Sequence, residues 1–209
     1  MFLCCFRQYV FSFFHLFCQR GKSVRQAIFL DRDGTINLEK DYLYSIEEFE
    51  FIPGAAEAVS LLNMAGFFVA VVSNQSGIAR GYYTEEDVEK LHRHISAEIK
   101  KRGGRIDAWL YCPHHPSGRG SHALPCRCRK PLPGMLHQAE KLFDIDLSSS
   151  IMIGDKLSDI EAGIAAGCLP ILVRTGYGIS EEERLPEGVA VYDDILEAAR
   201  SIVHNLVPV

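Results

Sequence analysis

Two carboxylates stand one residue apart near the start of the chain, directly after a short apolar run. The run covers residues 27–30, and Asp31 and Asp33 follow it. An apolar run that ends in a charged, glycine-containing turn is typical of a strand buried on both faces of a parallel sheet. Two ionised carboxylates this close repel each other unless a cation lies between them, and oxygen ligands of this kind select Mg²⁺. An acidic surface turn is the competing interpretation of this fragment taken alone.

A second group of residues with metal-binding chemistry lies in the middle of the chain. Cys112 and His114 form one pair and Cys126 and Cys128 another, with eleven residues between the pairs. Four sulfur and imidazole donors suit tetrahedral Zn²⁺, and a closed set of four is typical of a structural site. His115 is the alternative to His114 as the fourth ligand, and free cysteines beside surface histidines are the alternative to a metal. A bound metal would order the loop 112–128, which otherwise lacks a structural signal.

Alternating strands and helices are expected to position these groups. Strands are predicted at 27–30, 67–72, 108–111, 151–154, 170–174 and 189–192, and helices at 54–64, 84–101, 133–143, 156–166 and 195–205. Four strands end in polar groups, namely Asp31 with Asp33, Ser73, Asp155 and Thr175. We therefore predict an α/β fold with a doubly wound, Rossmann-like parallel sheet, helices on both faces and these polar groups at one edge.

The length of the chain predicts one domain. Its 209 residues are enough for one core. Residues 25–209 are assigned to that domain, and the intervals between motifs leave no room for a large cap domain. Residues 1–24 form an apolar and aromatic extension that lacks the features of a secretory signal and is marginal as a membrane span. An extension without a role in the fold is the preferred interpretation, and a membrane anchor is the alternative.

Composition limits the partners and the compartment. The net charge is −5, from 22 basic and 27 acidic residues, and no basic patch is present, so nucleic-acid binding is not expected. Seven cysteines are an odd number, and three of them lie near histidines, which favours a reducing compartment and a metal over disulfides. We expect a cytoplasmic monomer.

Four motifs in order resemble the haloacid dehalogenase superfamily of phosphohydrolases over residues 25–178. They are Asp-x-Asp-Gly-Thr after the first strand, Ser after the second, Lys before a later helix, and Gly-Asp-x-x-x-Asp after the fourth strand. Within the superfamily, Phe-Leu-Asp-Arg-Asp-Gly-Thr-Ile-Asn, Cys-Pro-His-His-Pro and Cys-Arg-Cys-Arg-Lys-Pro look like the zinc-bearing branch that acts on heptose bisphosphate or histidinol phosphate. Ser73 stands where Thr is frequent, and the hydroxyl is retained.

The resemblance implies a role for each motif. Asp31 would be a nucleophile that forms an aspartyl-phosphate, and Asp33 a general acid and then base. Ser73 and Lys130 would bind the phosphoryl oxygens. The implied Mg²⁺ ligands are Asp31, Asp33 through its backbone carbonyl, and Asp155; the structural Zn²⁺ ligands are Cys112, His114, Cys126 and Cys128. The implied substrate-binding residues are Glu39, Lys40, Asp41, Tyr42, Asn74, Gln75, Ser76, Arg129 and Lys156.

The function implied in this way is Mg²⁺-dependent hydrolysis of a small-molecule sugar bisphosphate. The expected reaction removes the phosphate on C7 of a heptose 1,7-bisphosphate, in the synthesis of activated heptose for surface polysaccharide. A histidinol-phosphate phosphatase is the first alternative. A zinc-stabilised binding protein that has lost catalysis is the second, and the presence of Asp31, Asp33, Lys130 and Asp155 together argues against it.

Overall fold

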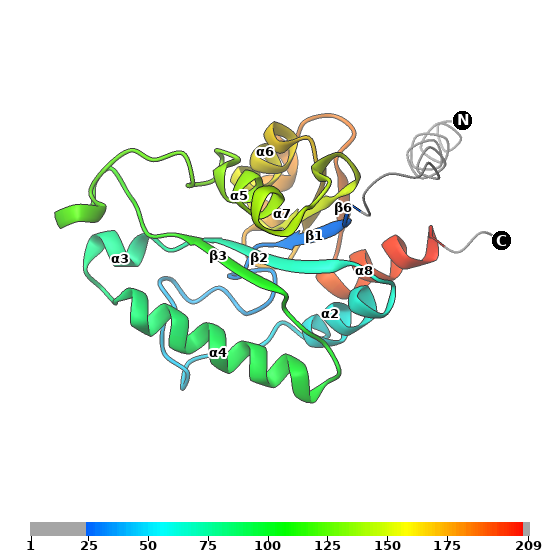
Figure 1. Ribbon diagram of the computed structural model, residues 1–209, viewed down its shortest axis with the longest axis horizontal. Coiled ribbons are helices and arrows are strands. Elements are labelled where there is room, and N and C mark those ends of the chain that lie inside the picture. The colour runs from blue at the N-terminus through cyan, green and yellow to red at the C-terminus, as the bar shows by residue number, and fades with distance from the viewer. Residues whose placement is uncertain (1–23, 207–209) are drawn as a thin grey trace.

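A computed structural model describes residues 24–206 of the chain. Its centre is one six-stranded sheet with the strand order β3-β2-β1-β4-β5-β6, and every neighbouring pair is parallel (Figure 1). The strands are β1 (Ala27–Leu30), β2 (Phe68–Asn74), β3 (Ala108–Cys112), β4 (Ile151–Gly154), β5 (Leu169–Val173) and β6 (Ala190–Tyr192). The predicted doubly wound α/β fold is confirmed.

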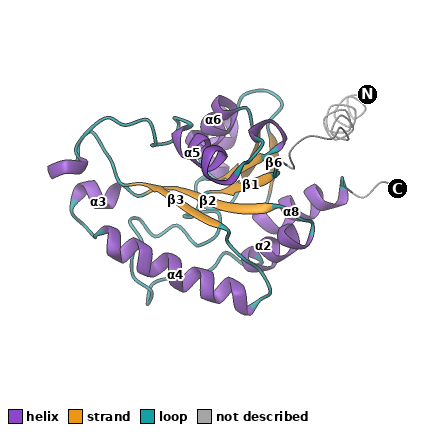
Figure 2. Ribbon diagram, viewed as in Figure 1, coloured by secondary structure: helices purple, strands orange, loops and turns teal. Residues whose placement is uncertain are grey.

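Helices cover both faces of this sheet (Figures 1 and 2). They are α2 (Ala55–Met64), α3 (Ser76–Arg80), α4 (Glu85–Lys101), α5 (Gly134–Phe143), α6 (Leu157–Ala166), α7 (Gly178–Glu181) and α8 (Ile195–His204), with short 3-10 helices η1 (Gly120–His122), η2 (Leu147–Ser149) and η3 (Glu182–Arg184). Alternate side chains of β1 face opposite layers. Ile28 and Leu30 pack with residues of α2, α4 and α8, whereas Ala27 and Phe29 pack with residues of α5 and α6.

The strand order places the ends of β1, β2 and β4 next to one another. β1 pairs with β2 on one side and with β4 on the other, with Leu30 level with Val71 and with Ile153. The strands after β1 are added on one side of it as far as β3 and on its other side from β4 onward. Ligands of such sheets bind at the carboxyl ends of the strands at this switch point. The polar groups that follow β1, β2 and β4 are therefore gathered where a ligand is expected.

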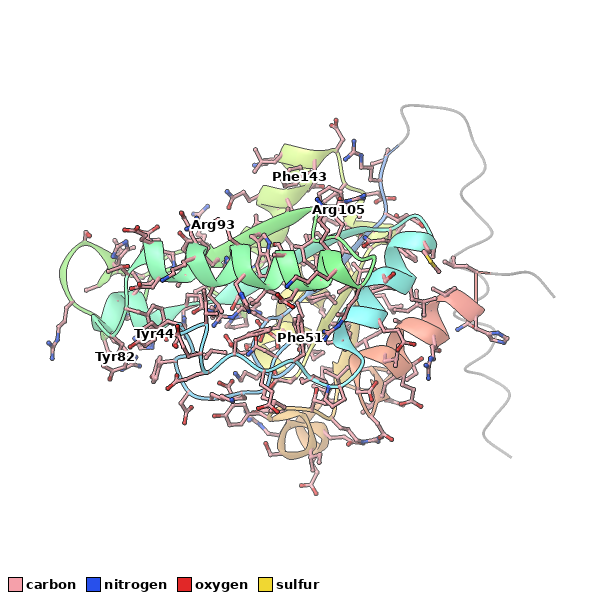
Figure 3. All side chains as sticks on the ribbon, turned by 90° about the horizontal axis from the view of Figure 1, so that it is seen from below. Tyr44, Phe51, Tyr82, Arg93, Arg105 and Phe143 are labelled. Atoms are coloured by element: carbon pink, nitrogen blue, oxygen red, sulfur yellow. The ribbon has the colours of Figure 1, made fainter. Side chains whose placement is uncertain are left out.

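The long helix α4 begins where its sequence predicts. Thr84 is the N-cap, and its hydroxyl accepts a hydrogen bond from the Asp87 N–H at 3.2 Å while the Asp87 carboxylate accepts one from the Thr84 N–H at 2.8 Å. The inner face of α4 is buried, and Arg93 lies on the outer face (Figure 3). Buried His92 stacks on Trp109 of β3 with 4.1 Å between the ring centroids.

The segments that join β1 to α2 and β3 to α5 are loops, and residues 24–206 contain no cap domain. Ile36, Leu43 and Ile52 anchor the first of these loops in the core. No helix within residues 24–206 has both the length and the apolar character to cross a membrane. The predicted N-terminal extension lies outside the described residues except for Val24.

The packing of α2 gives a test of the fold. Leu62 is fully buried against the sheet, whereas Met64 on the same helix is 78% exposed. Leu62→Ala removes buried methyl groups and leaves a cavity, so we expect the free energy of unfolding in urea to fall by about 2–5 kcal/mol. Met64→Ala is the matched control and is expected to change it by less than about 0.5 kcal/mol. Equal effects of the two substitutions would contradict the assigned packing of α2.

Candidate active site

Three buried carboxylates and one buried ammonium group meet at the ends of β1 and β4. Asp31 follows β1, Asp155 follows β4, and Asp159 lies in the first turn of α6, and one oxygen of each lies within 4.8 Å of the others. The ammonium nitrogen of Lys130 is 2.8 Å from Asp31 Oδ1 and 2.7 Å from Asp159 Oδ1, and it donates to the carbonyl of Val72 at 2.6 Å. Lys130 thus forms ion pairs with Asp31 and Asp159 but not with Asp155.

Asp155 is the carboxylate in need of a cation. It is fully buried, and its Oδ1 has no hydrogen-bond partner among the described residues, while its Oδ2 accepts only the N–H of Tyr177 at 2.9 Å. Burial, and then the charges of Asp31 and Asp159, raise the pKa of Asp155 to about 8. Mg²⁺ prefers oxygen ligands, and carboxylate oxygens of Asp31 and Asp159 lie beside the unpartnered oxygen of Asp155. The residues present therefore fit that ion.

Glycines make room for Asp155. A Cβ atom at Gly34 would lie 2.2 Å from Asp155 Oδ2, and one at Gly176 would lie 2.1 Å from the same oxygen. Both residues also have a positive φ, of 84° and 57°, which L side chains rarely adopt. The Gly of the Asp-x-Asp-Gly-Thr motif is thus required by the approach of the Asp155 carboxylate as well as by the turn.

The position of Lys130 is fixed by Asn74. The side-chain amide of Asn74 donates to the Lys130 carbonyl at 3.0 Å, and its oxygen accepts the Lys130 N–H at 3.0 Å. Burial disfavours the ammonium charge, but Asp159 and Asp31 outweigh it and raise the pKa of Lys130 above its ordinary value. Lys130 is therefore held charged against Asp31, and Asn74 uses its side-chain amide to hold it there.

Asp33 accepts hydrogen bonds on both carboxylate oxygens. Arg32, through Nε at 3.1 Å and Nη2 at 2.9 Å, and Asn37 at 3.0 Å donate to Oδ1; Gln75 donates to Oδ2 at 3.1 Å. Burial alone would raise the pKa of Asp33, but the Arg32 charge and these hydrogen bonds lower it below its ordinary value. Arg32 is itself fully buried and also donates to the carbonyl of Leu43 at 2.7 Å. Asp33 is thus an oriented, ionised carboxylate in this state.

Gln75 joins Asp33 to the end of β2. Its amide nitrogen donates to Ser73 Oγ at 2.7 Å as well as to Asp33, and its oxygen accepts the hydroxyl of Tyr83 at 2.7 Å. The Tyr83 hydroxyl donates because the amide nitrogen already faces two other partners, which fixes the orientation of the amide. Tyr83 in turn stacks on Tyr44 of the loop after β1, and Tyr44 lies near the N-terminal end of α4 beside Tyr82 (Figure 3).

A cavity of about 370 Å³ opens above these groups. Its lining residues are Asp31, Asp33, Glu39, Asp41, Tyr42, Ser73, Asn74, Gln75, Ser76, Tyr83, Arg129, Lys130, Lys156, Ser158, Asp159 and Tyr177. Of the predicted catalytic and substrate-binding residues, only Lys40 does not line it: its ammonium group binds the carbonyl of Glu48 at 2.8 Å and the carboxylate of Glu50 at 3.3 Å instead. Asp155 lies among the buried carboxylates and is not part of the lining.

On one side of the cavity rim, the loop after β1 contacts two segments, the one after β4 and the one after β5. Glu39 forms a 2.7 Å ion pair with Lys156, whose ammonium group lies 4.6 Å from the centre of the Tyr177 ring. The Tyr177 hydroxyl donates to Asp41 at 3.4 Å. Asp41 and Tyr42 both have positive φ values, of 40° and 60°, so the loop bends sharply here. These contacts hold the predicted residues Glu39 and Asp41 at the rim, and Tyr42 contacts the Tyr82 ring at 4.8 Å between centroids.

The predicted zinc ligands come together next to the cavity. Cys112 Sγ lies 3.5 Å from Cys126 Sγ and 3.1 Å from Cys128 Sγ, and His114 Nδ1 lies 3.3 Å from Cys128 Sγ. One donor atom of each of the four lies within 4.8 Å of the others, which is compact enough for a tetrahedral set around zinc. His115 is directed elsewhere, because its Nδ1 accepts the N–H of Ser117 at 3.1 Å. The geometry favours His114 over His115 as the fourth donor.

Known proteins resemble both the sequence and the fold. A family model described as HAD-hydrolase-like matches residues 127–198. A protein of Escherichia coli (strain K12) named D-glycero-beta-D-manno-heptose-1,7-bisphosphate 7-phosphatase is 47% identical over 164 residues, which cover 78% of this chain and 85% of that protein. The chain belongs to the haloacid dehalogenase-like hydrolases.

Two further members of this hydrolase family match most of the chain. A protein of the same name from Pseudomonas aeruginosa is 41% identical over 181 residues, covering 86% of this chain and 98% of that protein. The crystal structure of D,D-heptose 1,7-bisphosphate phosphatase from B. bronchiseptica, complexed with magnesium and phosphate, has a TM-score of 0.79 and 36% identity, covering 86% of this chain and 98% of that one.

Some residues of the site have no role in the prediction from the sequence, namely Arg32, Asn37, Tyr83, Ser158, Asp159 and Tyr177. Asp159 was seen in the Gly-Asp-x-x-x-Asp motif but given no role, although its place one helical turn after Asp155 was a usable signal. Arg32, Tyr83 and Tyr177 carried no signal of this kind. The contacts of these residues join segments that are distant in the sequence, or they depend on how a loop bends. Neither feature can be predicted from a local sequence pattern.

The electrostatics of Asp155 give a test in the metal-free protein. Its folded pKa of about 8 lies above its ordinary value, so the folded state binds more protons than the unfolded chain between about pH 4 and 8, and stability falls as the pH rises through this range. Asp155→Asn removes the charge and keeps an oxygen for the Tyr177 N–H. In urea unfolding with chelator present, we expect the variant to be more stable than wild type by more than about 1 kcal/mol at pH 8.

The gain should shrink as the pH falls to about 4, where the wild-type carboxyl is protonated in the folded state and about half protonated in the unfolded chain. Glu161→Gln, which neutralises an exposed carboxylate of α6, is the matched control and is expected to show no such pH-dependent gain. An Asp155→Asn variant that is less stable than wild type at pH 8 would show that Asp155 is not short of a positive partner.

Proposed function

We propose that this hydrolase removes the 7-phosphate of D-glycero-β-D-manno-heptose 1,7-bisphosphate to give heptose 1-phosphate and inorganic phosphate. The observation that carries the proposal is the pairing of buried Asp31 with Lys130 on a cavity that Asp33 also lines. Relatives 41–47% identical bear the name of this activity, and their names specify the β anomer, which the sequence alone left open. The proposed pathway is the synthesis of activated heptose for surface polysaccharide.

Asp31 is the proposed nucleophile. Lys130 occupies Oδ1 of Asp31, which leaves the other carboxylate oxygen to attack the phosphorus of the 7-phosphate. The bond from this oxygen to phosphorus forms as the bond from phosphorus to the C7 oxygen breaks, and the leaving oxygen takes a proton from Asp33. The result is an aspartyl-phosphate and the free heptose 1-phosphate.

Asp33 then acts as the base of the second step. Having lost its proton, its carboxylate accepts one from a water molecule, whose oxygen attacks the phosphorus and releases the Asp31 carboxylate. The hydrogen bonds from Arg32, Asn37 and Gln75 orient Asp33 in both steps. The hydroxyl of Ser73 and the ammonium group of Lys130 stabilise the charge on the transferred phosphoryl oxygens.

The proposed metal site uses Asp31, Asp155 and the backbone carbonyl of Asp33. A bound Mg²⁺ would supply charge neutralisation of the phosphoryl oxygens and a fixed position for the phosphate. A solved relative was crystallised with magnesium and phosphate, which supports this choice of ion. Asp159 lies in the same carboxylate cluster, with Lys130 at 2.7 Å from its Oδ1 and the N–H of Lys156 donating to its Oδ2 at 3.0 Å.

We also propose that Cys112, His114, Cys126 and Cys128 bind a structural zinc ion. Cys112 ends β3 and Cys128 lies two residues before Lys130, so the ion would tie the sheet edge to the backbone that carries Lys130. The zinc would therefore act on catalysis through the position of Lys130 and not in the reaction itself.

The remaining proposals concern the whole chain. We assign residues 25–209 to a single phosphatase domain with the zinc loop at 112–128, and propose that it acts as a monomer in the cytoplasm. The four cysteines within residues 24–206 form no disulfide.

Asp31→Asn and Lys130→Ala test the proposed reaction. Phosphate release from D-glycero-β-D-manno-heptose 1,7-bisphosphate with Mg²⁺ is expected to be abolished in Asp31→Asn, because the amide is not a nucleophile. In Lys130→Ala it is expected to fall about 100-fold or more, because a fixed donor to the transition state is lost. Chelation of divalent ions is expected to stop the wild-type reaction. Faster wild-type hydrolysis of histidinol phosphate than of either heptose anomer would contradict the proposed substrate.

His114→Ala and His115→Ala test the proposed zinc set. Zinc content is measured by inductively coupled plasma mass spectrometry. It is expected to be about one ion per chain in wild type and His115→Ala, and to fall in His114→Ala. The melting temperature should fall with the zinc, because metal binding contributes to folding free energy. A His115→Ala variant that loses its zinc while His114→Ala keeps it would exchange the two assignments.

A further inference from the structure

Tyr83 is a buried tyrosine that lines the cavity and has no part in the reaction proposed above. It lies between α3 and α4, is 7% exposed and packs with Ile78 and Val88. A Cβ atom at Gly77 would lie 2.2 Å from its ring, so a larger residue there would displace the ring. Tyr44 of the loop after β1 stacks on the ring with 5.3 Å between centroids. These contacts hold the ring, and with it the hydroxyl, in one place.

The hydroxyl of Tyr83 bonds to the side-chain amide of Gln75. It donates to Gln75 Oε1 at 2.7 Å, and no other donor to this oxygen is found within residues 24–206. Burial raises the pKa of Tyr83 to about 12, so the hydroxyl keeps its proton for this bond. Gln75 is itself only 1% exposed, and a buried amide oxygen without a donor is costly. The position of the Gln75 amide therefore depends on Tyr83.

The nitrogen of the same amide serves two groups of the proposed reaction. It donates to Asp33 Oδ2 at 3.1 Å and to Ser73 Oγ at 2.7 Å. Because Ser73 Oγ accepts this hydrogen bond, its own proton stays free for a phosphoryl oxygen. If the amide turned over, its oxygen would face the Asp33 carboxylate and would compete for the Ser73 proton. One amide orientation thus serves Asp33 and Ser73 together.

Gln75 contacts the oxygen of Asp33 that is left for proton transfer. Oδ1 of Asp33 accepts three hydrogen bonds, two from Arg32 and one from Asn37. Oδ2 accepts one within residues 24–206, from Gln75. A carboxylate oxygen with one donor keeps a lone pair for a proton, so Oδ2 is the atom that can give a proton to a leaving group and take one from water. Gln75 fixes the direction of this oxygen.

We propose that Tyr83 is a positioning residue that acts through Gln75 to direct Asp33 toward the leaving-group oxygen. The inference rests on the proposed function and adds to it a side chain that bonds directly to none of the proposed catalytic residues. Proton transfer in the transition state requires a short, aligned contact between the carboxyl and the leaving oxygen. Without the Tyr83 hydroxyl, the buried amide oxygen loses its donor, the amide moves, and Asp33 loses the contact that aligns Oδ2.

The test compares two leaving groups. Steady-state kcat and KM are measured with Mg²⁺ on D-glycero-β-D-manno-heptose 1,7-bisphosphate, whose alkoxide needs a proton to leave, and on p-nitrophenyl phosphate, whose nitrophenolate leaves without one. In Tyr83→Phe, kcat/KM is expected to fall about 10-fold or more on the sugar and less than about 3-fold on p-nitrophenyl phosphate. The KM for the sugar should change less than about 2-fold, because the loss lies in the transition state.

Tyr82→Phe is the matched control. Tyr82 is 56% exposed, and its hydroxyl forms no hydrogen bond within the described part of the chain. Its edge contact with the Tyr42 ring, at 4.8 Å between centroids, is one that a phenylalanine keeps. We expect wild-type kcat and KM on both substrates in this variant. Melting temperatures show that each variant is folded.

A double-mutant cycle tests whether Tyr83 acts through Gln75. In the Gln75→Ala background, Tyr83→Phe is expected to change kcat/KM on the sugar by less than about 2-fold, because the amide that carries the effect is absent. The same loss with and without Gln75 would show that Tyr83 acts by another route and would overturn the inference. Equal losses on the two substrates would also overturn it, since the defect would then lie outside proton transfer to the leaving group.

Failure of the proposed function is distinguishable from failure of this inference. If the heptose bisphosphate is not hydrolysed, the proposed substrate is wrong, and the same comparison is made with histidinol phosphate, which is also an alkyl phosphate. Hydrogen exchange of the Gln75 side-chain amide, measured by NMR and assigned by its loss in Gln75→Ala, needs no turnover. In Tyr83→Phe this exchange is expected to be about 10-fold faster or more. An unchanged exchange rate would overturn the inference whatever the substrate.

Discussion

The burial of the Lys130 ammonium group between Asp31 and Asp159 is the constraint on which the rest of the site depends. Each of these residues is at most 5% exposed, and a charge removed from water is tolerated only with close partners of opposite sign. Lys130 serves two carboxylates and a backbone carbonyl, which accounts for its three donor protons. Asp155 forms no ion pair within residues 24–206, so the same sheet edge that pairs one carboxylate creates the demand for a cation at the next.

Two contacts from different parts of the sequence hold the backbone that carries this ammonium group. Asn74 at the end of β2 clamps the backbone of Lys130 from one side. From the other side, the N–H of Gly134 donates to the carbonyl of Arg127 at 3.1 Å, and a Cβ at Gly134 would lie 2.1 Å from that carbonyl oxygen. Lys130 thus sits in a tight turn between the cysteine pair and α5. The loop has little regular structure, but the backbone around Lys130 is held by hydrogen bonds from Asn74 and Gly134.

The sequence was sufficient for the parts of the site that lie at strand ends. The pattern of apolar residues predicts buried strands that end at Asp31, Ser73 and Asp155. Parallel pairing of these strands is then enough to bring the three side chains to one edge of the sheet. The spacing of the cysteine and histidine pairs predicts a cluster, and the structure brings Cys112, His114, Cys126 and Cys128 together, while their binding of zinc stays a prediction. Lys40 was placed at the cavity from its neighbours, but the ion pair with Glu50 turns its side chain away. Such a contact depends on how the loop bends at Asp41, where a non-glycine residue has a positive φ that no local pattern predicts.

The hydrogen bonds around Asp33 favour one half of the proposed reaction over the other. Arg32, Asn37 and Gln75 stabilise its carboxylate, which suits a base that accepts a proton from water but opposes the protonated form needed to assist the leaving group. The substrate changes this balance, because the negative charge of a phosphate held against Asp31 lies close to Asp33 and raises the pKa of that carboxyl. Departure of the heptose phosphate and capture of the phosphoryl group by Asp31 lower the charge again. A phosphate on Asp31 would therefore favour the protonated form of Asp33 when an acid is required, while the protein contacts favour the carboxylate when a base is required.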